Sequence, residues 1–559
     1  MTRAAAAAAL LAIAITSRGG AAATPAAADP PDLILHTGKI VTVDAAFSYA
    51  EAVAIRAGRF VAVGKNSEVR ALAGPRTRAI DLAGRTVVPG LADNHLHNAG
   101  GGPGIDLSHA RSVADVLSAV ADRVRRARPG EILITNRDWH EAQLAEQRLP
   151  LRRDLDRVAP ENPLVVVRGG HEYILNSAAL RKWRIDESTP EPAGGRISRY
   201  DDGSLNGELV DRAKALVPAA DLASPLGSDR TRTLDERIAE KIAEYRKLHA
   251  AGLTSLRHPG VGATDVALLA EMHKRGLLTM RVNVLLTPDA VGQHRQDEGD
   301  EWLRIGGIKL GVDGGFEGGW MREPYEEPFG EKGTYRGLQT MTAAAFASRV
   351  RTLNRDGWRV FTHAVGDAAI DQVLDGYEAA DADAPIVGRR WGIEHAFIAW
   401  PDHFARMKKL GLAVSAQDHL YLAGPSLVKY WGAKRAARTT PLRAFLDAGL
   451  PVSLGTDSSV VPYPPLWGIY HFVTRDTISG GVLGADQRIT RQEALRANTM
   501  GYAWLTVEEA QKGSIEPGKL ADLVVLSDDI MTCPEPRIAQ IQVLMTIVGG
   551  RVVHERPKS

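Results

Sequence analysis

Cysteine is almost absent from this sequence, which has one thiol, Cys533, in 559 residues. A single cysteine cannot form an intramolecular disulfide, so cysteine usage indicates neither an oxidising nor a reducing compartment. An excess of charge is also missing, because 68 lysines and arginines face 67 aspartates and glutamates and the net charge is +1. We therefore expect no nucleic-acid partner and no anionic membrane surface. A small-molecule substrate is the expected partner, and a homo-oligomer stays open.

Apolar runs long enough to cross a membrane are lacking as well. At the N-terminus, Arg3 precedes an apolar run over residues 4–15, well short of the roughly 20 residues that a spanning helix needs. Small residues follow as far as Ala28. This order is typical of a secretory signal peptide, which we predict over residues 1–28, with export to the periplasm or the medium. The alternative is an alanine-rich tail.

What is present is a long chain with two β-rich ends. Short β-type runs separated by glycines occupy residues 32–88, and residues 506–559 contain further runs around a Gly549-Gly550 turn. The clearest runs are 33–36, 39–43, 52–55, 60–63, 522–526 and 543–548. Because both ends consist of short β-type runs separated by turns, we predict that they pair into one small sheet domain.

Between these ends, apolar runs alternate with helical segments such as 265–275 and 342–356. The strand candidates are 87–91, 253–256, 280–286, 308–312, 359–363, 392–395, 412–415 and 451–455. Alternation of this kind predicts a parallel sheet of the α/β class, and the number of units favours a closed (β/α)8 barrel over residues 89–109 and 241–505. The stretch between the first two runs is too long for one helix, so residues 110–240 are predicted to form an inserted subdomain.

Metal-binding side chains follow several of these runs. In the extended segment His95-Leu96-His97, the two imidazoles point the same way and can reach one metal ion. With 16 histidines in 559 residues, chance alone supplies roughly half such a triplet per chain, so the pair is weak by itself. Further metal-binding groups stand at later strand ends: Lys309, His363, His395 and Asp457. Because all carboxyl ends of a parallel barrel share one face, these groups are predicted to converge.

With these groups in this order, the chain resembles the amidohydrolase superfamily, specifically the amidohydrolase family 3 or YtcJ-like branch, which includes the N-substituted formamide deformylases. The resemblance covers nearly the whole chain after residue 28. It rests on the segments 89–97, 307–314, 362–369, 393–396, 455–457 and 513–523. The resemblance implies a (β/α)8 barrel with a small β-sandwich built from both termini.

The resemblance also implies roles for the strand-end residues. His95 and His97 look like ligands of the more buried metal, and His363 and His395 look like ligands of a second. Asp457 resembles the last-strand aspartate that binds metal and handles the proton of the attacking water. Lys309 matches a lysine that is carboxylated in binuclear relatives and bridges two metals; the alternative is a cation paired with Asp313 or with a substrate carboxylate. The implied cofactor is one or two divalent ions, expected to be zinc.

Further residues are predicted to surround this centre. His171 and Asn176 match an insertion segment that reaches the site in the family, and we expect His171 to contact the substrate or its oxyanion. A segment rich in glycine, aromatic and charged residues follows the lysine strand, and from it we expect further substrate contacts: Asp313, Glu317, Trp320 and Arg322. Relatives carry an aspartate after the second strand where this chain has Arg257-His258, which either favours an anionic substrate or is structural.

The predicted activity is that of a metal-dependent hydrolase acting on carbon–nitrogen bonds other than peptide bonds. The metal ion of such a hydrolase lowers the pKa of bound water to about 7 and thereby supplies hydroxide at neutral pH. The rival reactions on the same scaffold are ester or carbamate hydrolysis, isomerisation and decarboxylation. A non-catalytic binding or regulatory protein is the rival from another class, and loss of the ligand residues would be its signature.

Overall fold

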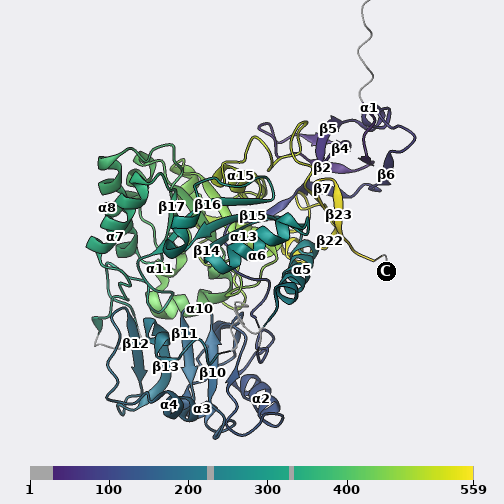
Figure 1. The fold of residues 1–559 in the computed structure, drawn as a ribbon. Helices are drawn as coiled ribbons and strands as arrows, with labels where there is room; N and C mark the ends of the chain where they lie inside the picture. Colours follow the sequence, from purple (N-terminus) through teal and green to yellow (C-terminus); the bar gives the residue numbers. More distant parts are fainter. Residues whose placement is uncertain (1–28, 103, 223–231, 327–332, 558–559) are drawn as a thin grey trace, which may run out of the picture.

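The computed structural model describes residues 29–102, 104–222, 232–326 and 333–557, and its ribbon has three parts (Figure 1). A β-rich part, purple and yellow, contains strands from both ends of the chain and adjoins a central part of strands and helices. The segment drawn in blue forms the third part. The predicted signal peptide, residues 1–28, lies outside the described residues. In the described part of the chain, no helix has the length and apolar character that a membrane crossing requires.

The central part is built on eight parallel strands, each paired with its neighbour in chain order. They are β8 (Leu91–Asp93), β14 (Leu253–Val261), β15 (Arg281–Leu286), β16 (Leu303–Gly311), β17 (Val360–Ala364), β18 (Gly392–His395), β19 (Ala413–Gln417) and β20 (Val452–Gly455). The last strand lies beside the first, as two contacts show. Asn94 N donates to Leu454 O at 3.1 Å, and Leu96 forms a parallel bridge with Ser458. The predicted α/β fold is thus confirmed, and the sheet is nearly closed into a barrel.

The start of the barrel differs from the prediction. The run 87–91 was expected to be its first strand, but residues Thr86–Pro89 (β7) pair with β2 and β21 in another sheet, and β8 begins at Leu91. Gly90 separates the two strands, and a Cβ there would collide with the side chain of Thr254. The chain can therefore step from one sheet to the other only with glycine at this close approach.

Helices alternate with the barrel strands and bury apolar side chains. In α7 (Ala343–Arg355), the Thr342 side chain caps the first turn, and Phe346, Val350 and Leu353 are buried at helical spacing. The other helices after the insertion are α5 (Leu234–Ala250), α6 (Ala263–Lys274), α8 (Asp367–Asp383), α9 (Pro401–Lys409), α10 (His419–Trp431), α11 (Ala433–Ala437), α12 (Leu442–Asp447), α13 (Pro465–Thr474), α14 (Arg491–Asn498), α15 (Met500–Leu505) and α16 (Glu535–Ile538).

The β-rich part contains two sheets. The six-stranded sheet has the order β23-β22-β21-β7-β2-β3, and the four-stranded sheet has the order β5-β4-β1-β6. Their strands are β1 (Leu33–His36), β2 (Lys39–Val41), β3 (Tyr49–Ala50), β4 (Ala52–Arg56), β5 (Arg59–Gly64), β6 (Arg78–Asp81), β21 (Leu523–Leu526), β22 (Val543–Val548) and β23 (Arg551–Glu555), with helix α1 (Asn66–Arg70) beside them. Strand β21 pairs antiparallel with β7, so the two ends of the chain share one sheet.

The third part is an insertion between β8 and β14 with its own five-stranded sheet, ordered β12-β13-β11-β10-β9. Its elements are β9 (Leu133–Ile134), β10 (Leu164–Arg168), β11 (Glu172–Leu175), β12 (Gly195–Arg199), β13 (Leu205–Asp211), α2 (Val113–Val124), α3 (Arg152–Leu155) and α4 (Ser177–Trp183). Strands β10 and β11 are buried over most of their length, and the loop between them, residues 169–171, reaches the cavity described below.

Candidate metal and substrate site

The predicted metal ligands lie on or just after barrel strands whose carboxyl ends share one face. His95 and His97 follow β8, Lys309 lies in β16, His363 in β17, His395 ends β18, and Asp457 follows β20. The structure brings several of these side chains together: the rings of His95 and His395 have centroids 4.9 Å apart, and those of His363 and His395 are 4.6 Å apart. The convergence arises because parallel strands end on the same side of the sheet.

Three of these residues form a compact group of potential ligands. His95, His395 and Asp457 each offer one ligand atom, and these atoms lie within 4.8 Å of one another. Oδ1 of Asp457 lies 3.5 Å from Nε2 of His95 and 3.2 Å from Nε2 of His97. His395 and Asp457 both adopt positive φ angles, 72° and 61°, a backbone region that non-glycine residues avoid and that is found disproportionately at functional sites.

The ring of His95 is oriented by a contact with Glu394. Its Nδ1 lies 2.6 Å from Oε2 of Glu394, and burial lowers the pKa of His95 to about 4. The neutral ring therefore donates its Nδ1 proton to Glu394 and leaves a lone pair on Nε2, on the side of Asp457, available to a metal ion. Burial opposes ionisation of Glu394, but Arg257, with Lys309 and His95, holds the pKa of that carboxyl below its ordinary value.

Arg257 lies inside the barrel rather than at its mouth. It is buried, its Nε donates to Asn94 O at 2.6 Å, and its Nη2 donates to Glu394 Oε1 at 2.7 Å. Its charge is thus matched by Glu394, which favours the structural alternative over attraction of an anionic substrate. His258 packs beside His97, with ring centroids 6.2 Å apart.

These donors fit a metal ion. Nδ1 of His395 is buried and has no hydrogen-bond partner in the described part of the chain, and burial lowers the pKa of His395 well below its ordinary value. An orphaned neutral imidazole beside His95, His97 and the Asp457 carboxylate supplies the nitrogen and oxygen donors that zinc prefers.

Lys309 stands inside the barrel near the same residues. Burial lowers the pKa of Lys309 to about 8. Among the described residues it forms no ion pair, and Asp313, the alternative partner, instead accepts from the backbone N–H groups of Trp320, Val365 and Gly366 at 3.0, 3.1 and 2.9 Å. The structure therefore does not contain the Lys309–Asp313 pair.

His363 lies beside the compact group but is turned partly away from it. Its Nε2 lies 3.1 Å from the carbonyl oxygen of Gly314 and 3.4 Å from Oδ1 of Asp313. Its ring also lies 5.5 Å, centroid to centroid, from that of His171. His363 thus links the ligand group to the insertion.

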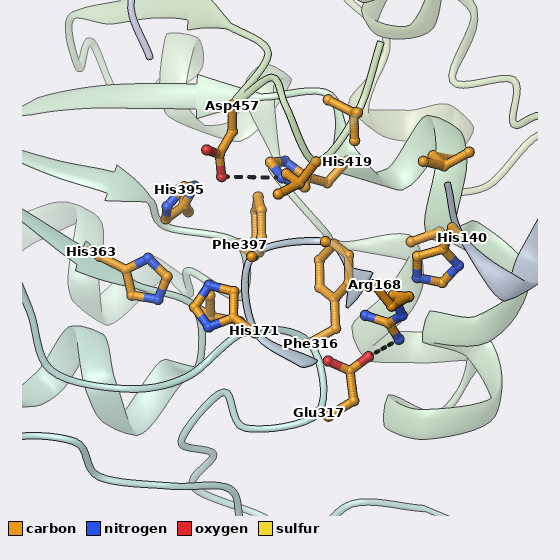
Figure 2. Close-up of a pocket in the computed structure, with 18 of the residues that line it drawn as sticks. His140, Arg168, His171, Phe316, Glu317, His363, His395, Phe397, His419 and Asp457 are labelled. Atoms are coloured by element: carbon orange, nitrogen blue, oxygen red, sulfur yellow. Dashed lines mark hydrogen bonds and ion pairs between the residues drawn. The ribbon is translucent and has the colours of Figure 1, made fainter. Parts of the chain in front are cut away.

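A cavity of about 520 Å³, including its mouth, opens over these side chains (Figure 2). His171 enters it from the insertion, and Nδ1 of His171 lies 2.6 Å from Oδ1 of Asp211. Asp211 has a φ of 49° and is packed against the loop after β16, where a Cβ on Gly314 or Gly318 would collide with its carboxylate. The orientation of His171 is therefore fixed by a strained residue and a glycine loop.

Several cavity residues were not predicted. His419, at the start of α10, has its Nε2 3.4 Å from Oδ2 of Asp457. It follows the seventh barrel strand, so the strand-end rule used for the other histidines could have found it. His140 and Arg168, from the insertion, also line the cavity. Arg168 ends β10 of the insertion, and neither residue stands at the end of a barrel strand.

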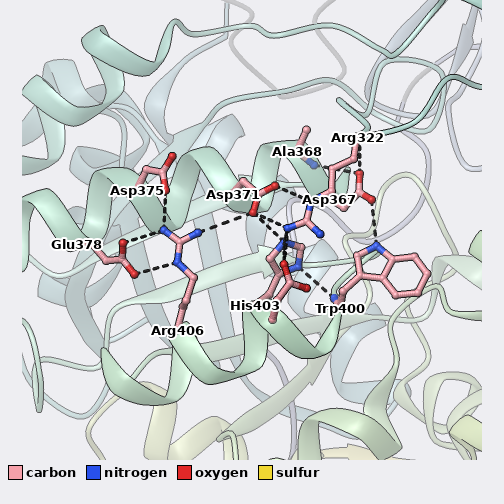
Figure 3. A network of polar contacts seen from close by, with 10 residues as sticks. Arg322, Asp367, Ala368, Asp371, Asp375, Glu378, Trp400, His403 and Arg406 are labelled. Atoms are coloured by element: carbon pink, nitrogen blue, oxygen red, sulfur yellow. Dashed lines mark hydrogen bonds and ion pairs between the residues drawn. The ribbon is translucent and has the colours of Figure 1, made fainter.

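Four predicted substrate residues do not line the cavity. One of them, Asp313, is buried and accepts from backbone N–H groups, as described above. The Asn176 side chain caps α4 and is satisfied by Leu164 N, Ala179 N, Ala159 O and Asn162 O, so it is structural. Arg322 does not line the cavity; it is held by Asp371 and Asp402, each at 2.6 Å, in a partly exposed network (Figure 3). Trp320 is half-buried and does not line the cavity either. Glu317, by contrast, lines it and pairs with Arg168.

Comparison with known proteins agrees with this architecture. The chain is 33% identical to an N-substituted formamide deformylase of Arthrobacter pascens, over 94% of this chain and 99% of that protein. It is 26% identical to the putative amidohydrolase YtcJ of Bacillus subtilis, over 94% of this chain and 99% of that protein.

Among solved structures, an uncharacterized metal-dependent hydrolase from Pyrococcus furiosus matches with a TM-score of 0.64 and 25% identity. The match covers 89% of this chain and all of the other. The model of the amidohydrolase family itself matches residues 78–554. The chain therefore belongs to the amidohydrolase family of metal-dependent hydrolases.

Proposed function

We propose that this protein hydrolyses the C–N bond of a small amide of the N-substituted formamide type. The observation that carries the proposal is the group of His95, His395 and Asp457, whose ligand atoms lie within 4.8 Å of one another beneath the cavity. The relative from Arthrobacter pascens, named for deformylation of N-substituted formamides, supports the choice of bond.

The metal would be held by His95, His97, His395 and Asp457, and a second ion would add His363 and Lys309. We expect zinc, because imidazole and carboxylate are its usual ligands. A bound divalent ion supplies a lowered pKa for water and polarisation of the substrate carbonyl. For Lys309 to contribute oxygen ligands, its neutral Nζ must form a bond to carbon dioxide and release one proton, giving a carbamate.

The chain's own residues then manage the proton and the substrate. We assign Asp457 to accept the proton of the attacking water and to deliver it to the leaving nitrogen. Its Oδ1 faces His95 and His97, and its Oδ2 faces His419. We assign His171 to orient the substrate, because Asp211 fixes its ring at the cavity wall. The apolar residues of the cavity limit water around the reacting bond.

We further propose export of the protein, on the basis of the leader-like residues 1–28. Fusion of this segment to a reporter that is active only outside the cytoplasm tests this directly. Activity of the reporter only inside the cell would contradict it.

Metal analysis and a substrate panel test the proposed activity. We expect at least one tightly bound transition metal per chain and hydrolysis of formamides in preference to esters and carbamates with the same substituent. Asp457→Asn should lower kcat/KM by about 100-fold or more, whereas Asp447→Asn, on the partly exposed helix α12, should not. Less than one metal per chain would overturn the metal site, and cleavage of esters or carbamates alone would overturn the C–N assignment.

A further inference from the structure

The end of the cavity remote from the metal-binding residues is polar. Figure 2 shows His140, Arg168 and Glu317 grouped there, with Phe316 between them and His363. All three polar residues are at most 4% exposed. The middle of the cavity is apolar, and its lining includes Phe316, Phe397, Leu422, Val460 and Val461. A substrate that fills this cavity therefore passes an apolar middle before it meets buried polar atoms.

The protonation of His140 follows from its neighbours. The backbone N–H of Ala142 donates to Nδ1 of His140 at 3.1 Å, closer than Oε2 of Glu141 at 3.4 Å, so Nδ1 carries a lone pair. Burial lowers the pKa of His140 to about 3, so the ring is neutral and its proton is on Nε2. Nε2 is buried and has no hydrogen-bond partner within the described ranges. A buried donor without an acceptor is costly, which points to a ligand that supplies one.

Arg168 is surrounded by carboxyl groups. Its Nε and Nη2 donate to Glu141 at 2.9 and 3.0 Å, Nη2 also donates to Glu317, and Glu172 lies 3.2 Å from Nε. Nη1 takes part in none of these contacts. Glu141 is in turn bound by the hydroxyl of Tyr430 at 2.7 Å, so its oxygens are engaged.

This arrangement selects against a negatively charged ligand. The charge of Arg168 is already matched by the Glu141 carboxylate, so an anion placed beside Arg168 would meet the negative charge of Glu141 in a region of low dielectric. An uncharged oxygen or nitrogen acceptor can take the hydrogen bonds without that repulsion.

We propose that Nε2 of His140 and Nη1 of Arg168 recognise an uncharged hydrogen-bond acceptor at the far tip of an apolar substituent on the substrate. This inference rests on the proposed function and names its substrate class: amides whose substituent is apolar along its length and has an ether, carbonyl or nitro oxygen at its end. His140 and Arg168 determine specificity and do not touch the scissile bond.

A pair of substrates of equal size tests the proposal. N-(para-methoxyphenyl)formamide and N-(para-ethylphenyl)formamide differ by an ether oxygen in place of a methylene. Because the formyl group has no substituent, the aryl group must occupy the cavity. We expect the wild-type protein to prefer the methoxy compound by about tenfold in kcat/KM. N-(para-carboxyphenyl)formamide should be the poorest of the three, and a preference for it would overturn the requirement for an uncharged tip.

Two variants of His140 separate its donor from its structural contact. His140→Asn keeps an oxygen near the position of Nδ1, able to accept from Ala142 N, but has no atom near Nε2. His140→Gln places an amide nitrogen near Nε2. We expect the methoxy preference to fall to about unity in His140→Asn, with an unchanged melting temperature, and to survive in part in His140→Gln. An unchanged preference in His140→Asn would overturn the role of His140.

Binding of the reaction products distinguishes this inference from the proposed function. Calorimetry on the metal-loaded wild-type protein would compare para-methoxyaniline with para-ethylaniline. If no formamide is cleaved but the methoxy compound still binds about tenfold more tightly, the proposed function fails and this inference stands. Equal affinities, or no detectable binding of either aniline, would overturn this inference whether or not formamides are cleaved.

Discussion

Nδ1 of His95 lies 2.6 Å from Oε2 of Glu394, and both side chains are buried beneath the cavity. The other oxygen of Glu394 accepts from Nη2 of Arg257 at 2.7 Å. The ring of one proposed metal ligand is therefore held by a carboxylate that is itself held by an arginine. Groups in this position fix the tautomer of a ligating histidine and raise its basicity.

Glu394→Gln should weaken metal binding by about 10- to 100-fold, because the amide replaces a charge-assisted contact to His95. The measurement is the metal retained per chain during titration with a chelator of known affinity. Glu378→Gln is the matched control, since Glu378 pairs with Arg406 on the outer face of the barrel helices. Equal metal retention in both variants would contradict the role of Glu394.

Lys309→Ala should lower both the bound metal and the activity, because it removes the only side chain proposed to react with carbon dioxide. Metal-free wild-type protein should recover more activity when it is reconstituted with bicarbonate than without it, and Lys309→Ala should show no such difference. Lys408→Ala, on the outer helix α9, serves as the control. A Lys309→Ala protein with two metals and full activity would remove the bridging role.

Asp211→Asn should lower kcat about tenfold with little change in KM, because the ring of His171 loses its charged partner while the side chain keeps its shape. Asparagine also tolerates the φ of 49° at this position. Asp221→Asn is the control, since Asp221 accepts a hydrogen bond from Trp183 Nε1 at 2.8 Å and does not line the cavity. A rise in KM alone, or a loss of folded protein, would speak against a positioning role.

Prediction from the sequence was most successful where the signal was periodic or lay at a strand end. The alternation of apolar runs and helices predicted eight parallel strands, and β15 (Arg281–Leu286) lies within one residue of the predicted run 280–286. The run 87–91 was misassigned because the strand before Gly90 and the strand after it are both apolar, and only the three-dimensional pairing separates them.

In the site, too, residues placed by the barrel strands were easier to predict than residues placed by local contacts. Strand-end side chains such as His395 and Asp457 converge as predicted, since their positions depend only on the barrel. Asn176 was assigned to the site by resemblance to the family, and Arg322 by its place after the lysine strand. In the structure, backbone groups bind the Asn176 side chain and carboxylates bind Arg322. His140 became visible only through its contacts, because η1 (Glu141–Gln143) has no pattern that marks its preceding residue as part of a cavity.

Arg322 binds both oxygens of Asp371 at 2.6 Å (Figure 3). It also lies 2.6 Å from Asp402. Burial opposes ionisation of Asp371, but His403 and Arg322 hold its pKa below the ordinary value. A carboxyl whose pKa is depressed by folding contributes stability above its unfolded pKa of about 4, and that stability is lost as the pH falls.

Arg322→Ala should therefore lower the melting temperature by about 1–3 °C at pH 7, a modest effect because the network is partly exposed. The difference from wild type should shrink as the pH falls below about 4, where Asp371 of the unfolded chain takes up protons that the folded protein still excludes. KM should not change, because Arg322 does not line the cavity. Arg351→Ala, which breaks another partly exposed pair with Asp383, is the control for loss of a surface arginine. A large rise in KM for Arg322→Ala without a change in melting temperature would return Arg322 to the substrate site.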